Sequence, residues 1–428
     1  MENGAAQKTT MDVTGIQVAH INTNPNPKTI EAVTKLAVCP SSEFFVSGSE
    51  TGALKVWDTS KLESVSAKNA MLSLDLGKEI TDIVFIPQRF VFGVATTDGQ
   101  IRLFRVHVVR GKNRKIIRYA KLAMIRVFKV ETGYARSISF STADFTLLLV
   151  AATSASKVVA YDIIKTSLVF ELQNPPQYGI PNTFVISKSS SWLLLGTSEG
   201  VLCFWDLRFG ILLRSWKVTT DQMGEASMEI KKLVTVSYVA GLGSSDSQYF
   251  AMIGGDQDVT IWEVPSFECR EILSSHQGSP KLIKYMLQKL GNTKTDPAEN
   301  ALAKLSLNFD LVQTKSNTSM VYADFAGTDI ARDGLIVTST NDNRVISWNL
   351  NDVSKSTLLL AAEKTNFTKS KTSLTLAISY EKPASQKNET TARKVPIVHD
   401  TINDIVVVSH PYPMIVAAER NGSIRVYK

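Results

Sequence analysis

Histidine, cysteine and carboxylate side chains could do catalytic or metal chemistry in this sequence, but their spacing does not suit it. The five histidines are dispersed, without the close spacing of metal ligands. The three cysteines, Cys39, Cys203 and Cys269, are also scattered, which argues against a disulfide framework or a zinc site. No phosphate-binding glycine loop and no nucleophile motif occurs. The sequence therefore predicts no catalytic residue, metal or cofactor, and a reducing, cytosol-facing compartment.

Three aspartates directly follow the aromatic residues that end copies of a recurring pattern, described below: Asp58, Asp162 and Asp206. Paired carboxylates are used in acid–base catalysis, so these residues need an explanation. They recur at one position of a repeat, and a turn or a hydrogen-bond network accounts for such a position. We therefore expect them to be structural.

A basic segment is the third chemical feature of the chain. Between Arg105 and Lys129 there are nine lysines and arginines and no acidic residue. Without these nine charges the formal net charge of +7 becomes −2, so the surface as a whole is not that of a nucleic-acid-binding protein. The segment is predicted to be a solvated hairpin; the alternative is contact with an anionic membrane or an acidic partner. The residues proposed for that contact are Arg110, Lys112, Arg114 and Lys115.

The aspartates and the basic segment lie in or next to a sequence pattern that recurs seven times. Each copy has a short apolar strand, a tight polar turn, and an alternating strand that ends on an aromatic anchor. An aliphatic residue stands three positions before every anchor, as in a strand buried on one face. Six positions before the anchor, three copies carry an aspartate that can bond to the turn backbone: Asp98, Asp256 and Asp342. The seven anchors are Trp57, Phe104, Tyr161, Trp205, Trp262, Trp348 and Tyr427.

Each copy also has an apolar stretch before it and another after it, such as VTKLAVCP at 33–40 and SLVFELQ at 167–173. Units of four strands with a terminal WD-like dipeptide are the signature of propeller blades. The sequence therefore predicts an all-β fold, a seven-bladed WD-repeat β-propeller over residues 15–428 that follows a flexible leader, residues 1–14.

The last copy reaches Lys428 directly after its aromatic strand, so its blade needs an outer strand from elsewhere. The stretch GIQVAHI at 15–21 is expected to supply that strand and to close the ring without an open sheet edge.

Several copies are farther apart than the roughly 40 to 45 residues of an undecorated repeat. The excess predicts insertions at about 105–129, 275–320 and 352–400. A helix is expected over 279–290, because an apolar stripe follows Pro280 and precedes Gly291. A capping-box pattern predicts a second helix from Asp296. The stretch 381–394 is polar and rich in turn-forming residues.

Three stretches resemble one family beyond the general repeat: GIQVAHINTN (15–24), EAVTKLAVCPSSEFFVSGSETGALKVWD (31–58) and GTSEGVLCFWDLRFGILLRSWKV (196–218). They resemble the C-terminal WD-repeat domain of the regulatory, protein-kinase-like subunit of the class III phosphatidylinositol 3-kinase, the vacuolar protein sorting type. The long insertions at 275–320 and 352–400 depart from that family.

The resemblance implies a non-catalytic scaffold that forms part of a larger peripheral membrane protein, whose kinase-like domain lies outside this chain. The implied partners are the lipid kinase catalytic subunit and coiled-coil subunits of the complex. The implied setting is vacuolar or endosomal sorting and autophagy, on endosomal, Golgi and vacuolar membranes reached from the cytoplasm.

Two alternatives remain at this point. The chain also resembles a G-protein β subunit, which implies a Gα-type partner. Propellers that bind phosphoinositides directly carry paired arginines within a Phe-Arg-Arg-Gly run. This chain has Leu207, Arg208, Phe209 and Gly210 instead, which disfavours that function. No nucleic-acid partner is expected.

Overall fold

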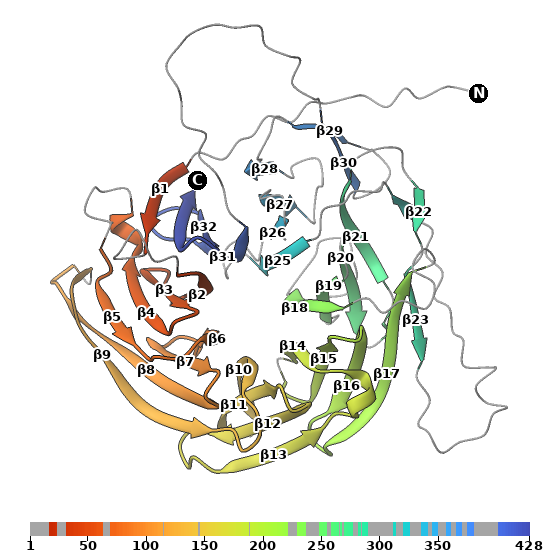
Figure 1. Ribbon diagram of the computed structural model, residues 1–428, viewed down its shortest axis with the longest axis horizontal. Helices are drawn as coiled ribbons and strands as arrows, with labels where there is room; N and C mark the ends of the chain where they lie inside the picture. Colours follow the sequence, from red (N-terminus) through yellow and green to blue (C-terminus); the bar gives the residue numbers. More distant parts are fainter. Residues whose placement is uncertain are drawn as a thin grey trace, which may run out of the picture.

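Short alternating strands form a ring of antiparallel sheets in the computed structural model (Figure 1). The structure describes the following residues: 17–23, 31–62, 69–113, 115–143, 146–187, 189–220, 229–236, 248–254, 258–264, 266–267, 269–276, 281–283, 285–289, 311–313, 320–325, 335–340, 345–349, 357–360, 365–369, 375–380 and 401–428.

The first three blades follow the chain in order, and the first strand of each lies nearest the centre (Figure 1). Blade 1 consists of β2 (Val33–Val38), β3 (Phe44–Ser49), β4 (Ala53–Asp58) and β5 (Leu72–Asp75). Blade 2 consists of β6 (Ile80–Phe85), β7 (Val91–Thr96), β8 (Gln100–Arg110) and β9 (Ile116–Lys129). Blade 3 consists of β10 (Ala135–Ala143), β11 (Thr146–Thr153), β12 (Lys157–Asp162) and β13 (Leu168–Gln173).

Blades 4 and 5 carry additional strands at their outer edges. Blade 4 consists of β14 (Pro181–Ile186), β15 (Trp192–Thr197), β16 (Val201–Asp206) and β17 (Ile211–Thr220), with β23 (Tyr285–Lys289) antiparallel to β17. Blade 5 consists of β18 (Ile230–Val236), β19 (Gln248–Gly254), β20 (Asp258–Val264) and β21 (Cys269–His276). Next to β21 lies β30 (Thr375–Tyr380), which runs parallel to it, and β29 (Thr365–Lys369) pairs antiparallel with β30.

Blade 6 consists of β25 (Met320–Phe325), β26 (Leu335–Thr340), β27 (Val345–Asn349) and β28 (Thr357–Leu360). A separate pair is formed by β22 (Lys281–Ile283) and β24 (Leu311–Gln313). The only helices among the described residues are two short 3₁₀ helices, η1 (Thr59–Lys61) and η3 (Pro176–Tyr178).

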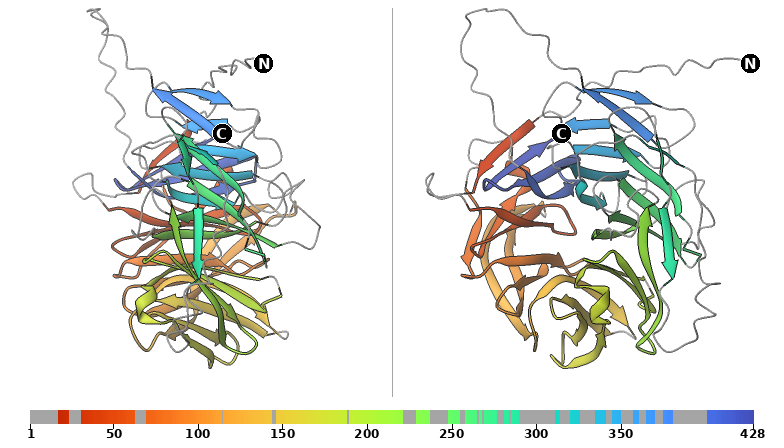
Figure 2. Two further views of the ribbon diagram at one scale, coloured as in Figure 1. Left: turned by 90° about the vertical axis from the view of Figure 1, so that its right-hand side faces the viewer. Right: turned by 45° about the vertical axis from the view of Figure 1, so that its right-hand side comes forward.

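Blade 7 is completed by a strand from the other end of the chain. Its own strands are β31 (Ile402–Val408), β32 (Met414–Glu419) and β33 (Ser423–Tyr427), and β1 (Gln17–Asn22) pairs antiparallel with β33. Both views of Figure 2, like Figure 1, place β1 beside blade 7. The backbone N–H and Oγ1 of Thr23 both donate to the Gly422 carbonyl, at 3.0 and 2.7 Å. The predicted seven-bladed propeller closed by an N-terminal outer strand is confirmed.

The helix predicted over 279–290 is wrong, because β22 and β23 occupy this stretch. The outer edge of β17 offers unpaired backbone N–H and C=O groups, and an extended segment satisfies them while a helix cannot. Local helix propensity is a weak preference that such tertiary pairing overrides. The second predicted helix from Asp296, the polar stretch 381–394 and the leader 1–14 lie outside the described residues.

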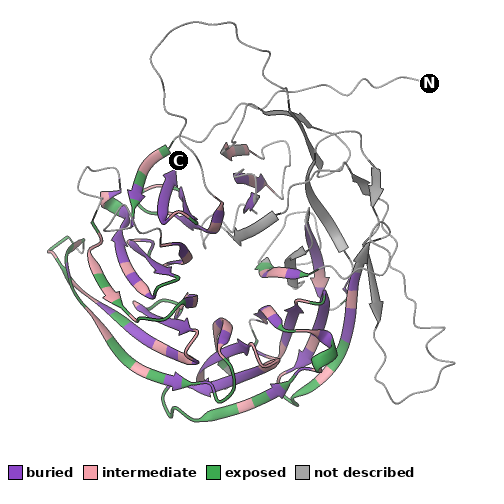
Figure 3. Ribbon diagram, viewed as in Figure 1, coloured by how far each residue is buried: buried purple, intermediate pink, exposed green. Residues whose placement is uncertain are grey.

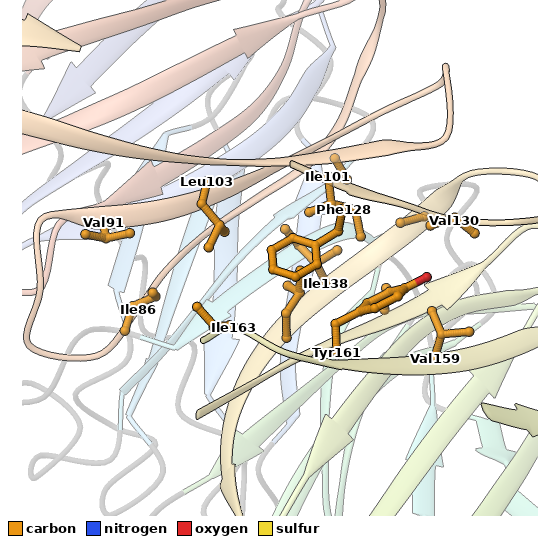
Figure 4. Packing of buried hydrophobic residues seen from close by; sticks show 14 residues of the cluster. Ile86, Val91, Ile101, Leu103, Phe128, Val130, Ile138, Val159, Tyr161 and Ile163 are labelled. Carbon is orange, nitrogen blue, oxygen red and sulfur yellow. The ribbon is translucent and has the colours of Figure 1, made fainter. Parts of the chain in front are cut away.

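The core consists of clusters between adjacent blades. Residues three apart on a strand point to opposite faces of the sheet. Each anchor in a described cluster therefore faces the preceding blade, while the aliphatic residue three positions earlier faces the following one. Figure 4 shows Tyr161 of blade 3 packed against Phe128 of blade 2, with ring centroids 5.5 Å apart. These strands are thus buried on both faces, and not on one as the alternation predicted, because each blade lies between two others.

One turn geometry recurs between the second and third strands of the blades. The residue five positions before the anchor has a positive φ, as in Gly52 (102°), Gly99 (76°) and Ser156 (58°). Its N–H donates to the carbonyl three residues earlier, for example from Gly99 to Thr96 at 3.1 Å. An ideal Cβ on Gly99 would lie 2.8 Å from the Gly133 oxygen, so glycine is needed there both for φ and for space.

Candidate interaction surfaces

The aromatic anchors are core residues, with exposed fractions of 8% or less. A buried indole N–H needs an acceptor, and the repeat supplies one in most copies. Trp57 donates to Ser47 Oγ at 2.9 Å, and Trp348 donates to Thr338 Oγ1 at 2.8 Å. Trp205 has no hydrogen-bond partner among the described residues. Leu195 stands ten residues before Trp205, at the position that Ser47 and Thr338 occupy before Trp57 and Trp348. Trp262 has Met252 at this position and donates to Thr260 Oγ1 instead, at 2.7 Å.

The aspartates after the anchors each cap a local turn. Asp58 accepts from the Ser60 N–H at 3.0 Å, Asp162 from the Ile164 N–H at 2.7 Å, and Asp206 from the Arg208 N–H at 2.9 Å. Backbone hydrogen bonds, chiefly from the N–H of residue 165, lower the pKa of Asp162. Hydrogen bonds from the side chain of residue 208 lower the pKa of Asp206. These carboxylates lie in separate blades, so they do not make an acid–base pair.

Asp98 lies in the turn of blade 2 and organises it. Its carboxylate accepts from Thr96 Oγ1 at 2.6 Å and from the Gln100 N–H at 3.1 Å, and it forms an ion pair with Arg102 at 2.7 Å. The equivalent residues Asp256 and Asp342 lie outside the described residues.

Side chains of the innermost strands tie neighbouring blades together around the centre. The second residue of such a strand donates to the next blade: Thr81 Oγ1 to the Ala135 carbonyl at 2.6 Å, and Asn403 Nδ2 to the Val33 carbonyl at 2.9 Å. The third residue accepts from the next blade in three cases. These acceptors are Asp82 (from the Ile138 N–H, 2.8 Å), Thr183 (from the Leu233 N–H, 3.1 Å) and Asp404 (from the Leu36 N–H, 2.9 Å).

These acceptors line a central cavity of about 840 Å³, whose wall comes from the innermost strands of several blades. Burial raises the pKa of Asp404, which is almost inaccessible to solvent. Sequence reasoning missed Asp82 and Asp404. The polar pairs Thr81-Asp82 and Asn403-Asp404 inside apolar strands are the signal that could have found them. Their hydrogen bonds join blades, so their role in the structure is to stabilise the ring.

The basic segment 105–129 is the outer strand pair of blade 2. It contains the end of β8 and all of β9, whose register runs from Gln100 opposite Lys129 to Arg110 opposite Ile116. Arg110 forms a bidentate ion pair with Glu43 of blade 1, at 2.6 and 2.7 Å.

Among the other residues proposed for anionic contact, Lys112 and Lys115 are exposed, whereas Arg114 lies outside the described residues. The structure thus brings Lys112 and Lys115 to the surface near the turn of this strand pair. It directs Arg110 toward the neighbouring blade.

Large apolar side chains are exposed on the outer parts of blades 3 and 4, where the outer strands carry exposed segments in Figure 3. The sequence alone did not reveal this surface, because exposed and buried apolar residues look the same in a repeat. We call these six residues the apolar rim: Ile164, Leu168, Val169, Phe209, Ile211 and Leu213.

Within the described ranges, no group of three or more histidine, cysteine, aspartate or glutamate side chains could hold a metal ion. No helix in this part of the chain has the length and apolar character needed to cross a membrane.

The comparisons with known proteins agree with this architecture. The family described as "WD domain, G-beta repeat" matches residues 25–58, which include β2, β3 and β4. A VPS15 serine/threonine-protein kinase of Komagataella pastoris is 26% identical over 97% of this chain. The resemblance predicted from the sequence is confirmed. VPS15 of Saccharomyces cerevisiae is 22% identical over 93% of the chain, and VPS15 of Arabidopsis thaliana is 24% identical over 69%.

The chain is therefore a WD-repeat propeller similar to part of the VPS15 proteins. It spans 30% of the length of the K. pastoris relative, 26% of the S. cerevisiae relative and 20% of the A. thaliana relative.

Proposed function

We propose that this chain is a non-catalytic scaffold that assembles a class III phosphatidylinositol 3-kinase complex for endosomal and vacuolar sorting and autophagy. The similarity to VPS15 proteins over 97% of the chain carries this proposal. The local chemistry supports it, because the polar residues that recur in the repeat are engaged in turns and blade-to-blade hydrogen bonds. The complex would act on the cytoplasmic surface of endosomal, Golgi and vacuolar membranes.

The apolar rim is the surface we propose for the protein partners. Its side chains are between 46% and 72% exposed, and exposed apolar surface of this kind marks sites of protein–protein interaction. Blades 3 and 4 are in contact at this surface. An ideal Cβ on Gly210 of blade 4 would lie 3.5 Å from Cδ2 of Leu172 in blade 3. Helices of coiled-coil subunits present apolar stripes that can cover such a surface. The lipid kinase catalytic subunit would be organised through these contacts.

The test is assembly with the lipid kinase and the coiled-coil subunits, measured by co-purification and cross-linking. Combined Leu168→Ser, Phe209→Ser and Ile211→Ser substitutions are expected to weaken assembly by about tenfold or more, since buried interface anchors each exceed about 1 kcal/mol on truncation. Met124→Ser with Val127→Ser is the matched control on blade 2, where both side chains are also exposed. Undiminished assembly of the apolar-rim variant, without cross-links to blades 3 and 4, would contradict the proposed surface.

The scaffold proposal also predicts that the purified chain neither hydrolyses ATP nor phosphorylates a substrate. Phosphoryl transfer requires a phosphate-cradling loop and metal-binding carboxylates, and the sequence has no such motif. ATP turnover that follows the chain through several columns would overturn the non-catalytic assignment. Selective capture of a Gα-type subunit in place of the lipid kinase subunits would overturn the assigned partner.

A further inference from the structure

The strand β9 is three residues longer than its partner β8, so three residues of β9 have no partner in β8. The register skips Ile117, Ala120 and Ile125, so each forms a bulge on the outer strand of blade 2. A bulge bends the strand and re-aims a side chain. Two of these three residues are large and apolar, and they are exposed: Ile117 by 67% and Ile125 by 42%.

Basic side chains lie between and beside these isoleucines. Lys112, Lys115, Arg118 and Lys121 are all exposed, and none of them has an ion pair with another described residue. No acidic residue occurs anywhere between 105 and 129. The basic ribbon, as we call residues 105–129, therefore presents a uniformly positive field around exposed apolar groups.

The ribbon is fixed to the body of the propeller. Arg110 is paired with Glu43, and its guanidinium lies 5.4 Å from the centre of the Phe90 ring. Tyr119, only 8% exposed, packs edge-on against Phe44 with ring centroids 5.9 Å apart. These contacts hold the backbone of the strand pair against the propeller before any partner arrives, which lowers the entropy cost of binding.

The composition of the ribbon favours a lipid surface over a protein. Protein interfaces are depleted in lysine and enriched in aromatic residues. This surface has four exposed lysines, Lys112, Lys115, Lys121 and Lys129, and no large aromatic side chain among its described residues is exposed. Strand addition is also disfavoured, because bulges prevent regular pairing along an edge. The outer strands β17 and β21 do accept additional strands, β23 and β30.

We propose that the basic ribbon docks this propeller on an anionic lipid bilayer. Ile117 and Ile125 would enter the headgroup region, and Lys112, Lys115, Arg118 and Lys121 would contact the anionic headgroups. This inference does not depend on the identity of the protein complex.

The experiment measures sedimentation of the full chain with vesicles of phosphatidylcholine, alone or mixed with phosphatidylserine. The parent chain is expected to bind the mixed vesicles and to release them as salt rises. Each basic residue near an anionic surface contributes about a fivefold factor in binding, so combined K112Q, K115Q, R118Q and K121Q substitutions should reduce the partition coefficient by about three orders of magnitude. The charge-matched control K78Q, R89Q, K165Q and R214Q removes exposed charges elsewhere and should have a much smaller effect.

Two further variants test the apolar contribution. Ile117→Ser with Ile125→Ser should weaken binding without any change of charge. Ile117→Trp should give indole fluorescence that shifts to the blue on anionic vesicles. The melting temperature of each variant reports whether its fold is intact. Equal binding by the basic-ribbon variant and its charge-matched control would overturn the proposal, as would binding of polyglutamate but not of anionic vesicles.

Discussion

Hydroxyl groups beside the buried tryptophans show how a repeated core satisfies its polar atoms. The indole N–H of an anchor is buried, so its acceptor has to be a protein group. Ser47 and Thr338 supply it at equivalent positions, and Leu195 in blade 4 does not. The hydrogen bond from the indole to this hydroxyl therefore stabilises its blade in addition to the apolar packing, and blade 4 lacks it.

Replacing Thr338 with valine keeps its shape and removes the acceptor for Trp348. The free energy of unfolding should fall by about 1 to 3 kcal/mol, because a buried donor is left without a partner. Thr338→Ser keeps the hydroxyl and should lose less. Denaturant titration of the two variants measures the difference, and equal stability of Thr338→Val and the parent would show that the hydrogen bond contributes nothing.

The ion pair between Glu43 and Arg110 predicts a pH dependence at the blade 1 to blade 2 contact. Hydrogen bonds from Arg110 lower the pKa of Glu43, so this contribution is present above the ordinary glutamate value of about 4.3 and is lost as pH falls through the lowered folded-state value. Both side chains are partly exposed, so the stability difference between the parent and Glu43→Gln should be below about 1 kcal/mol near neutral pH. Unfolding measured across the acid range should show this difference vanish; a difference that persists at low pH would contradict the assignment.

At the scale of the elements, the recurrent turn is a backbone requirement. Gly99 and Gly77 both have positive φ, of 76° and 65°. A Cβ on Gly99 would meet the Gly133 oxygen at 2.8 Å, whereas a Cβ on Gly77 would have no neighbour within 4 Å. A substitution at Gly77 therefore tests conformational strain alone, whereas one at Gly99 tests strain together with a steric clash.

Both Gly99→Ala and Gly77→Ala should lose about 1 to 2 kcal/mol, because an L-residue is strained in the left-handed region. Gly99→Ala should lose more, since its methyl group also displaces the Gly133 backbone. Thermal melting of the pair gives the comparison. If Gly77→Ala proves the more destabilising substitution, the space argument for Gly99 is wrong.

The strands of the blades were predictable because their apolar alternation and aromatic anchors are local signals. The strand β23 was not predictable, because its apolar residues also fit the spacing of an amphipathic helix. Only pairing with the edge of β17 selects the strand over the helix. The exposed positions of Ile117 and Ile125 were equally hidden, because a bulge depends on the register between two strands. Asp82 and Asp404 become acceptors only when the next blade is in place.

At the scale of the whole molecule, stability comes from contacts between blades. Each cluster joins two neighbours, and the inner-strand hydrogen bonds repeat that connection around the cavity. Such a ring has no free sheet face as long as the last blade is complete. The strand β1 completes it, and the buried Ile21 packs with Val33 of blade 1 and Val426 of blade 7. Removing β1 should therefore weaken both blades.

The measurement that tests this account most directly is equilibrium unfolding of two truncated chains, one lacking residues 1–12 and one lacking residues 1–24. Burial of Ile21 contributes about 1.5 to 3 kcal/mol, and each ladder hydrogen bond lost with β1 contributes about 0.5 to 1.5 kcal/mol. Their sum is comparable with the total stability of a typical domain, about 5 to 15 kcal/mol. The shorter truncation should leave the melting temperature unchanged, and the longer one should lower it strongly or cause aggregation. A chain from residue 25 onward that is as stable as the parent would contradict the closed ring.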